Sequence, residues 1–276
     1  MINNIKQLKN ILIESGIEKQ EAQAEVDFIL KYVLNIKFED IILGKKINDK
    51  LIKKAFEIVK ERAETKQPLM HILGFTIFMD NKFLVSKDTL IPRVETELLI
   101  KTCLNLINKN SKILDIGCGT GIISIMLNKL KNCFVDSCDI SFEALEVAKA
   151  NSENLKAKVT FFQSNLFENV QNNYDLIVSN PPYIPLKIKE TLQDEVKKHE
   201  PHNALFADDD LGIDFYQKII KSSSKYLNPN GYIAFELGIN QATYVKELFL
   251  NNNFKNIQIY EDLNNIERVI TAQKLE

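Results

Sequence analysis

The sequence contains no tryptophan, only three histidines and no long uninterrupted run of apolar residues. A membrane-spanning helix needs about 20 consecutive apolar residues, so no membrane span is expected. The first ten residues, MINNIKQLKN, also lack the apolar segment of a secretory signal peptide. We therefore expect a cytoplasmic protein without a membrane partner.

Cysteine clusters and an excess of basic charge are absent as well. The four cysteines form no CxxC pair, and their spacing to the histidines does not suit a zinc site. We therefore expect reduced, structural thiols and no metal. The formal net charge of −2 argues against a broad basic surface, so no direct nucleic-acid partner is expected.

The pattern of apolar residues changes along the 276 residues of the chain. Residues 1–67 have apolar positions at helical spacing and predict a small all-helical domain. Residues 68–87 hold two β-rich runs around Asp80-Asn81, a pair that tolerates positive φ, and predict a β-hairpin linker. Residues 88–276 are expected to form the main domain. Pro92 and the acidic residues after it predict the start of its first helix.

From residue 111 onward, strand-like and helix-like runs alternate. This alternation predicts an α/β fold with a doubly wound, mostly parallel, seven-stranded sheet. Ser141 is placed to act as the N-cap of the helix SFEALEVAKANSENL. The last two runs, KNIQIYED and ERVITAQK, have no helix between them and predict an antiparallel hairpin at the C-terminal end.

A glycine-rich turn, DIGCGTG, follows the first of these strands at residues 115–121. Its glycines allow a tight turn and a close approach to a ligand, but the spacing is GxGxG and not the GxGxxG of dinucleotide sites. Asp115 would repel a pyrophosphate, and Asp139, at the end of the next strand, can accept both hydroxyls of a ribose. S-adenosyl-L-methionine, a cationic nucleoside without phosphate, fits these features. A structural turn with a surface aspartate is the simpler alternative.

The fourth strand ends in the sequence Asn180-Pro181-Pro182-Tyr183. Proline cannot donate a ladder hydrogen bond, so the strand stops here, and Asn180 is confined to extended conformations because it precedes a proline. The Asn180 side-chain oxygen and a proline carbonyl can hold both N–H groups of a planar NH2, on which Tyr183 can stack. Catalysis would then depend mainly on positioning. No dedicated base is evident, and His71 is more consistent with a structural role.

Together these motifs resemble the protein-glutamine N(5)-methyltransferases that modify peptide chain release factors, over nearly the whole chain. DIGCGTG is similar to the family's adenosylmethionine loop, CDIS to its ribose-binding strand end and VSNPPYI to its catalytic loop. IPRVETELL resembles its PRPETE-type motif, and FELGINQ and DLNNIERV resemble its closing strands.

The resemblance implies a methyltransferase sheet, an N-terminal domain that helps grip the substrate, and a monomer. It implies a set of cofactor-binding residues: Gly117, Cys118, Gly119, Thr120, Gly121, Asp139, Leu166 and Asn180. The implied catalytic residues are Asn180, Pro181 and Tyr183, and Pro182 completes the substrate pocket. The implied substrate is the glutamine of the Gly-Gly-Gln loop in class 1 release factors, with S-adenosyl-L-homocysteine as the other product.

The chain departs from the family pattern at a few positions. Asn165 and Leu166 stand where the family commonly has an acid and an aromatic residue, which bears on adenine binding, and Val94 replaces the second proline of PRPETE.

Three alternative functions share part of this pattern. A glutamine methyltransferase of a large-subunit ribosomal protein is close, but the intact VETE favours the release-factor class. An adenine N6 or guanine N2 methyltransferase would use the same planar-amine chemistry, but the acidic segment EPHNALFADDD argues against nucleic acid. A non-catalytic adenosylmethionine-binding protein would be favoured by a degraded Asn180 or glycine loop, and both are intact.

Overall fold

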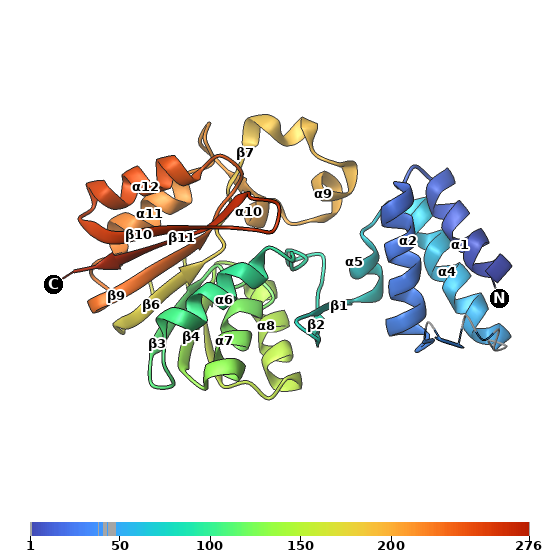
Figure 1. The fold of residues 1–276 in the computed structure, drawn as a ribbon, viewed down its shortest axis with the longest axis horizontal. Coiled ribbons are helices and arrows are strands. Elements are labelled where there is room, and N and C mark those ends of the chain that lie inside the picture. Colours follow the sequence, from blue (N-terminus) through green and yellow to red (C-terminus); the bar gives the residue numbers. More distant parts are fainter. Residues whose placement is uncertain (1, 38, 41–42, 44–47, 276) are drawn as a thin grey trace. The chain divides into compact units, whose positions relative to one another are not determined.

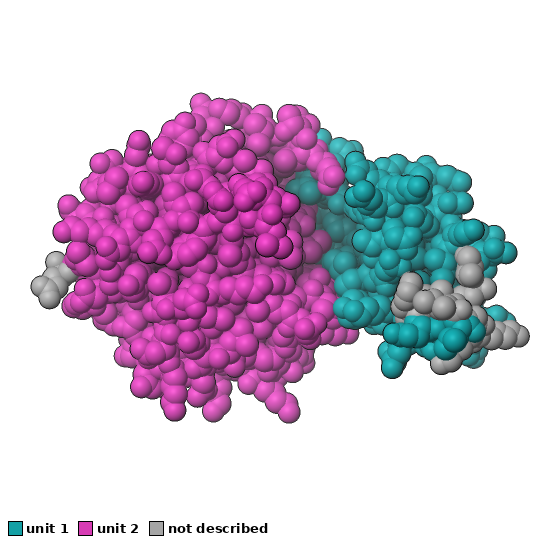
Figure 2. Space-filling view, in the orientation of Figure 1, with its two compact units in different colours: residues 1–73, 194–199 teal, residues 74–193, 200–276 magenta. Residues whose placement is uncertain are grey.

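The structure is a computed structural model, and it describes residues 2–37, 39–40, 43 and 48–275. The chain divides into two compact units, which Figure 2 shows in different colours. Unit 1 comprises residues 1–73 and 194–199, and unit 2 comprises residues 74–193 and 200–276. The short segment 194–199 therefore groups with the N-terminal helices.

Unit 1 consists of helices that enclose a core of their own. They are α1 (Ile2–Glu14), α2 (Lys19–Phe28), the π-helical η1 (Ile29–Val33), α4 (Asp49–Thr65), α5 (Leu69–Leu73) and α9 (Asp194–His199). Their core includes Leu8, Val26 and Val59, which are fully buried. The helical spacing of the apolar residues explains this arrangement, because each helix turns one apolar stripe inward.

A buried ion pair joins three helices of unit 1. The side chain of Arg62 in α4 is 2% exposed, and its Nε donates to Oε1 of Glu25 in α2 at 2.9 Å. The guanidinium also pairs with Glu195 of α9. A guanidinium removed from water needs such partners, so this contact holds α9 within unit 1.

Unit 2 begins with the predicted β-hairpin, whose strands β1 (Phe75–Phe78) and β2 (Asn81–Leu84) pair antiparallel. The two residues with positive φ in its turn are Met79 (43°) and Asp80 (59°). The turn is therefore one residue earlier than the expected Asp80-Asn81.

The helix expected near Pro92 begins later than the sequence suggests. Helix α6 spans Thr96–Leu106, because a turn precedes it in which the N–H groups of Thr96 and Glu97 bond to the carbonyls of Arg93 and Val94. Proline therefore lies ahead of the helix and not in its first turn.

The centre of unit 2 is a seven-stranded sheet in the order β10-β11-β9-β6-β3-β4-β5 (Figure 1). Its strands are β3 (Lys112–Ile116), β4 (Phe134–Asp139), β5 (Val159–Gln163), β6 (Tyr174–Ser179), β9 (Leu227–Glu236), β10 (Phe254–Glu261) and β11 (Glu267–Lys274). Neighbouring strands are parallel from β9 to β5, whereas β11 is antiparallel to both β9 and β10. The predicted fold class is confirmed, and the chain order reverses between β3 and β6.

Helices cover both faces of this sheet, as Figure 1 shows. On one face, α6 and α7 (Ile122–Lys131) pack on Ile113, Val178 and Ala234, with α8 (Phe142–Asn154) beside α7. On the other face, α11 (Asp214–Ser223) and α12 (Ala242–Asn251) pack on the alternate strand positions, such as Ile177 and Phe235. The central strands β3 and β6 thus bury both of their faces, as parallel strands in α/β proteins do.

Short elements follow β6 before the chain reaches α11. They are β7 (Ile184–Pro185), the 3-10 helix η2 (Leu186–Thr191), α10 (His202–Leu205) and β8 (Phe206–Ala207), and β7 pairs with β8. The four cysteines are buried free thiols. Across the described residues, no helix has the length and apolar character to cross a membrane, and no cluster of three metal-ligating side chains is found.

Candidate active site

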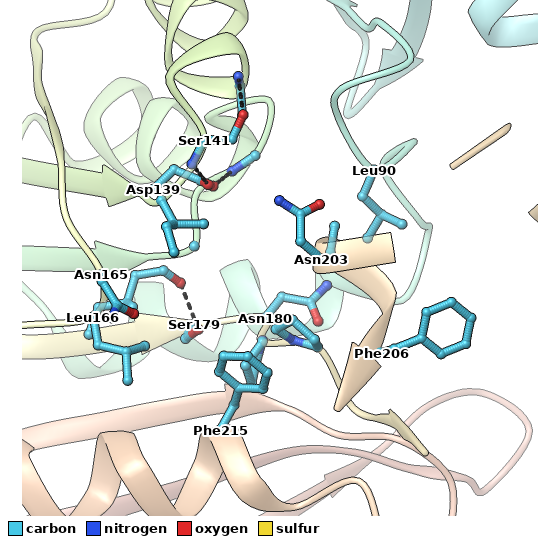
Figure 3. A pocket seen from close by; sticks show the side chains of 18 of the residues that line it. Leu90, Asp139, Ser141, Asn165, Leu166, Ser179, Asn180, Asn203, Phe206 and Phe215 are labelled. Carbon is cyan, nitrogen blue, oxygen red and sulfur yellow. Dashed lines mark hydrogen bonds between the residues drawn. The ribbon is translucent and has the colours of Figure 1, made fainter. Parts of the chain in front are cut away.

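A cavity of about 490 Å³ opens at the carboxyl edge of the sheet, where the strand order reverses between β3 and β6. Ligands of doubly wound sheets bind at this switch point. Figure 3 shows Asp139, Leu166, Asn180 and Phe215 around the cavity. Other lining residues are Asp88, Thr89, Leu90, Gly117, Gly119, Pro181, Pro182, His202, Asn203, Phe206, Asp208 and Lys218.

The glycine loop forms one wall of the cavity. Gly117 and Gly119 line it, and both have positive φ, 73° and 51°. A Cβ atom on either residue would meet no atom within 4 Å, so the space above these glycines is open to a ligand. Gly121 differs, because a Cβ there would lie 3.1 Å from the side chain of Ala148 in α8.

The other two predicted loop residues point into the protein. Cys118 packs with Leu145 and Ala148, and the carbonyl of Thr120 accepts a hydrogen bond from Asn151 Nδ2 at 3.0 Å. The Cys118 side chain and the Thr120 carbonyl therefore fix the loop against α8, while Gly117 and Gly119 face the cavity.

Asp115 lies fully buried at the end of β3, below this loop. Its Oδ2 accepts from the Ser124 N–H at 3.2 Å, while its Oδ1 has no hydrogen-bond partner among the described residues. Burial raises the pKa of Asp115 to about 7. The carboxyl is thus only partly charged near neutral pH, and it repels a phosphate less strongly than a fully ionised aspartate would.

Asp139, at the end of β4, has its carboxylate fixed by the backbone. Its Oδ2 accepts from the Gly119 N–H at 2.8 Å, and its Oδ1 accepts from the Ser141 N–H at 3.0 Å (Figure 3). Burial raises the pKa of Asp139, and these hydrogen bonds act in the opposite direction. Each oxygen keeps a second lone pair, so the carboxylate can still accept two ligand hydroxyls. Ser141 caps α8 as expected, since its Oγ accepts from the Ala144 N–H at 3.1 Å.

Leu166 and Asn165 also line the cavity, in the turn after β5. Leu166 has a positive φ of 51°, and its carbonyl accepts from the Ser164 Oγ at 2.9 Å. This turn presents an apolar side chain to the cavity where the family pattern has an aromatic one.

Asn180, Pro181 and Pro182 form the opposite wall, directly after β6. Ser179 ties this strand end to the glycine-loop strand, because its Oγ donates to the Ile116 carbonyl at 2.6 Å. The glycine loop and the NPPY loop therefore face one another across the cavity, as the sequence predicts. Neither proline has an N–H to donate, which leaves their neighbouring carbonyls as acceptors.

Tyr183 is held behind this wall. Its carbonyl accepts from Gln241 Nε2 at 2.9 Å, and the same amide group donates to the carbonyls of Leu211 and Gly212 at 2.8 and 3.1 Å. Its ring packs against the core and against Gly238, where an added Cβ would lie 2.9 Å from Cδ2.

Thr96 and Glu236 lie beside the site but are not predicted as site residues from the sequence. They belong to the motifs IPRVETELL and FELGINQ. Glu236 at the end of β9 is 1% exposed, and its Oε2 accepts from Thr96 Oγ1 at 2.7 Å. Burial raises the pKa of Glu236 to about 7, and a hydrogen bond from the Asn180 side chain lowers it. A carboxylate at the end of a strand adjacent to the NPPY strand was the signal that could have revealed it.

His71 lies in α5 of unit 1, buried, and is not among the cavity residues.

Comparisons with known proteins agree with this geometry. Residues 93–198 match the Methyltransferase small domain family. The chain is 39% identical over 258 residues to the release factor glutamine methyltransferase of Fusobacterium nucleatum subsp. nucleatum, covering 91% of this chain and 73% of that protein. It is 36% identical over 266 residues to the release factor glutamine methyltransferase of Geobacter sulfurreducens, covering 95% of this chain and 92% of that protein.

Among solved structures, a methyltransferase from Pyrococcus furiosus has the same fold. The two structures match with a TM-score of 0.53 at 19% identity, over 81% of this chain and 99% of that chain. At this identity the likeness concerns the fold alone.

Proposed function

The chain belongs to the release factor glutamine methyltransferases, and from this premise we propose that it methylates the side-chain amide nitrogen of a glutamine. The substrate is the glutamine of the Gly-Gly-Gln loop in class 1 peptide chain release factors, and the methyl donor is S-adenosyl-L-methionine. The enzyme acts as a monomer in the cytoplasm.

One observation above all supports this proposal. Asn180, Pro181 and Pro182 line the same cavity as Gly117, Gly119 and Asp139, although the two groups come from different strands of the sheet. One wall is suited to a ribose and the other to a planar NH2 group.

The cavity fits S-adenosyl-L-methionine in three respects. The Asp139 carboxylate is fixed by two backbone N–H groups with lone pairs to spare for the ribose hydroxyls. The open space at Gly117 and Gly119 admits the ligand close to the backbone, and Leu166 offers an apolar surface to adenine.

The chain's own contribution to the reaction is to hold the amide. Asn180 Oδ1 and the Pro181 carbonyl accept the two N–H groups of the glutamine, Pro182 completes the pocket, and Tyr183 supports the loop from behind. Hydrogen bonds that draw charge toward nitrogen offset the delocalisation of its lone pair. When bound, the cofactor would supply a sulfonium-activated methyl group: the N–C bond would form as the C–S bond breaks, S-adenosyl-L-homocysteine would leave, and the nitrogen would lose one proton to water.

The test is a methyl-transfer assay with labelled S-adenosyl-L-methionine. A release factor, a ribosomal protein and a nucleic acid are offered in parallel to the wild-type protein. Label in the release factor, located to its Gly-Gly-Gln glutamine, is the expected result. Label in nucleic acid alone contradicts the proposal and favours an amino-group methyltransferase of bases.

Asn180→Ala separates the role of the amide from general damage. Because it removes the acceptor of one substrate N–H, we expect turnover to fall by about 100-fold or more, while labelled cofactor still binds. Asn110→Ala is the matched control, since Asn110 is exposed and precedes β3 at the opposite edge of the sheet. Equal turnover in the two variants would refute the amide-holding role.

A further inference from the structure

The ends of β6 and β9 place Asn180 beside Glu236. Ser179 is in register with Phe235 in this parallel pair, so the residues that follow them occupy neighbouring positions. Side chains alternate along a strand, and Val178 and Ala234 belong to the core beneath α6. Asn180 and Glu236 therefore lie on that same face of the sheet.

Glu236 is itself fixed on two sides. Thr96, the first residue of α6, donates its hydroxyl to Oε2 at 2.7 Å. Tyr216 of α11 donates its hydroxyl to the Glu236 backbone carbonyl at 2.9 Å. The carboxyl group is thus buried in a fixed position within reach of the Asn180 amide.

We propose that Glu236, held by Thr96, is a positioning residue that sets which end of the Asn180 amide faces the cavity. An ionised carboxylate only accepts hydrogen bonds, so it selects the NH2 end of the amide. The oxygen of Asn180 is then directed toward the cavity, where it accepts from the substrate nitrogen. The inference rests on the proposed function, because only an NH2 substrate requires an acceptor at this point.

The charge of Glu236 gives the proposal a pH dependence. Burial, and to a smaller extent Glu95, raise its pKa, whereas the hydrogen bonds from Thr96 and Asn180 and the charge of Arg268 lower it, and the resulting pKa is about 7. Two neutral phenols, Tyr183 and Tyr216, face the same region, and burial raises the pKa of both, so they do not titrate near neutral pH. Protonated Glu236 donates a hydrogen bond and favours the opposite sense of the Asn180 amide. Turnover should therefore fall as the pH drops below about 7.

Glu236→Gln tests the proposal, because glutamine has the same shape but can present either NH2 or oxygen to Asn180. We expect kcat to fall about 10- to 100-fold, as for a misplaced catalytic group, and the acidic limb of the kcat profile to disappear. Thr96→Val should lower kcat in the same direction, whereas Thr96→Ser, which keeps the hydroxyl, should retain it. Thermal unfolding by circular dichroism identifies any variant that fails to fold.

A double-mutant cycle distinguishes positioning from a separate structural effect. If Glu236 acts through Asn180, Glu236→Gln should add no further loss in the Asn180→Ala background. An additive loss, or a Glu236→Gln protein with the kcat and pH profile of the wild type, overturns the inference. The proposed function fails by a different result, namely a wild-type protein that transfers no methyl group to the release factor. The variants are then compared on the acceptor that the wild-type protein does methylate.

Discussion

Replacing Gly212 by alanine tests how tightly the NPPY loop is held from behind. Gly212 has a φ of +71°, and a Cβ on it would lie 2.0 Å from the Tyr183 carbonyl oxygen and 2.6 Å from Gln241 Nε2. The backbone after Pro182 must therefore move, and the hydrogen bonds of the Gln241 amide must break or lengthen. Strain at positive φ costs about 1–2 kcal/mol, and overpacking adds about 1–3 kcal/mol.

Gly74→Ala is the matched control for this variant. Gly74 also has a φ of +71°, but a Cβ there would meet no atom within 4 Å, so it carries the strain without the collision. We expect the free energy of unfolding to fall by about 1–2 kcal/mol in Gly74→Ala and by about 2–5 kcal/mol in Gly212→Ala. Turnover should fall only in Gly212→Ala, because only that variant displaces Tyr183.

The measurements are urea unfolding followed by circular dichroism, since the chain has no tryptophan, and methyl transfer per folded molecule. Equal losses of stability and equal turnover in the two variants would show that the Tyr183 carbonyl is not a rigid part of the site.

Three further predictions concern the ionisable groups. Arg62→Met should lower the free energy of unfolding of the protein by about 3–5 kcal/mol, because it leaves Glu25 buried without its cation. The control Lys53→Met breaks an exposed ion pair and should change the free energy of unfolding by less than about 1 kcal/mol. Similar losses in the two variants would contradict the stabilising role of the buried pair. Asp139→Asn should weaken cofactor binding about 10-fold or more in calorimetry, since an NH2 group replaces one hydrogen-bonding carboxylate oxygen; unchanged affinity would exclude this carboxylate as the ribose acceptor. Burial raises the pKa of Asp115 from 3.8 to about 7, so between these pH values the folded state keeps a proton that the unfolded chain has lost, and stability falls as the pH rises. Asp115→Asn should therefore reduce the fall of the thermal midpoint with pH, measured without cofactor. An unaltered slope would show that other groups cause the pH dependence.

Much of the fold follows from local sequence signals. The alternation of strands and helices, the C-terminal antiparallel strands and the Ser141 cap each depend on a few neighbouring residues, and the structure has all of them. The errors are local as well. The hairpin turn and the start of α6 are displaced because several turn types share the same residue preferences, and tertiary contacts choose between them.

Only those walls of the cavity that a single short motif forms could be predicted from the sequence. The glycine loop and the NPPY loop are contiguous in sequence, and the rule that ligands bind at the switch point brings them together. His202 and Phe206 line the same cavity from the short elements α10 and β8, and no local pattern indicates where those elements fold. Their placement depends on tertiary packing, which a single sequence does not reveal.

Asn180 shows why motif and support must be considered together. Its place in the chain fixes the backbone, because the following proline restricts it to extended conformations. The proline does not decide which end of the side-chain amide meets the substrate, and a reversed amide would present a donor to a donor. That choice needs a buried acceptor, and the ionised Glu236 that supplies it comes from a strand that is distant in sequence but adjacent in the sheet. The chemistry of the NPPY loop is therefore completed by residues outside the motif.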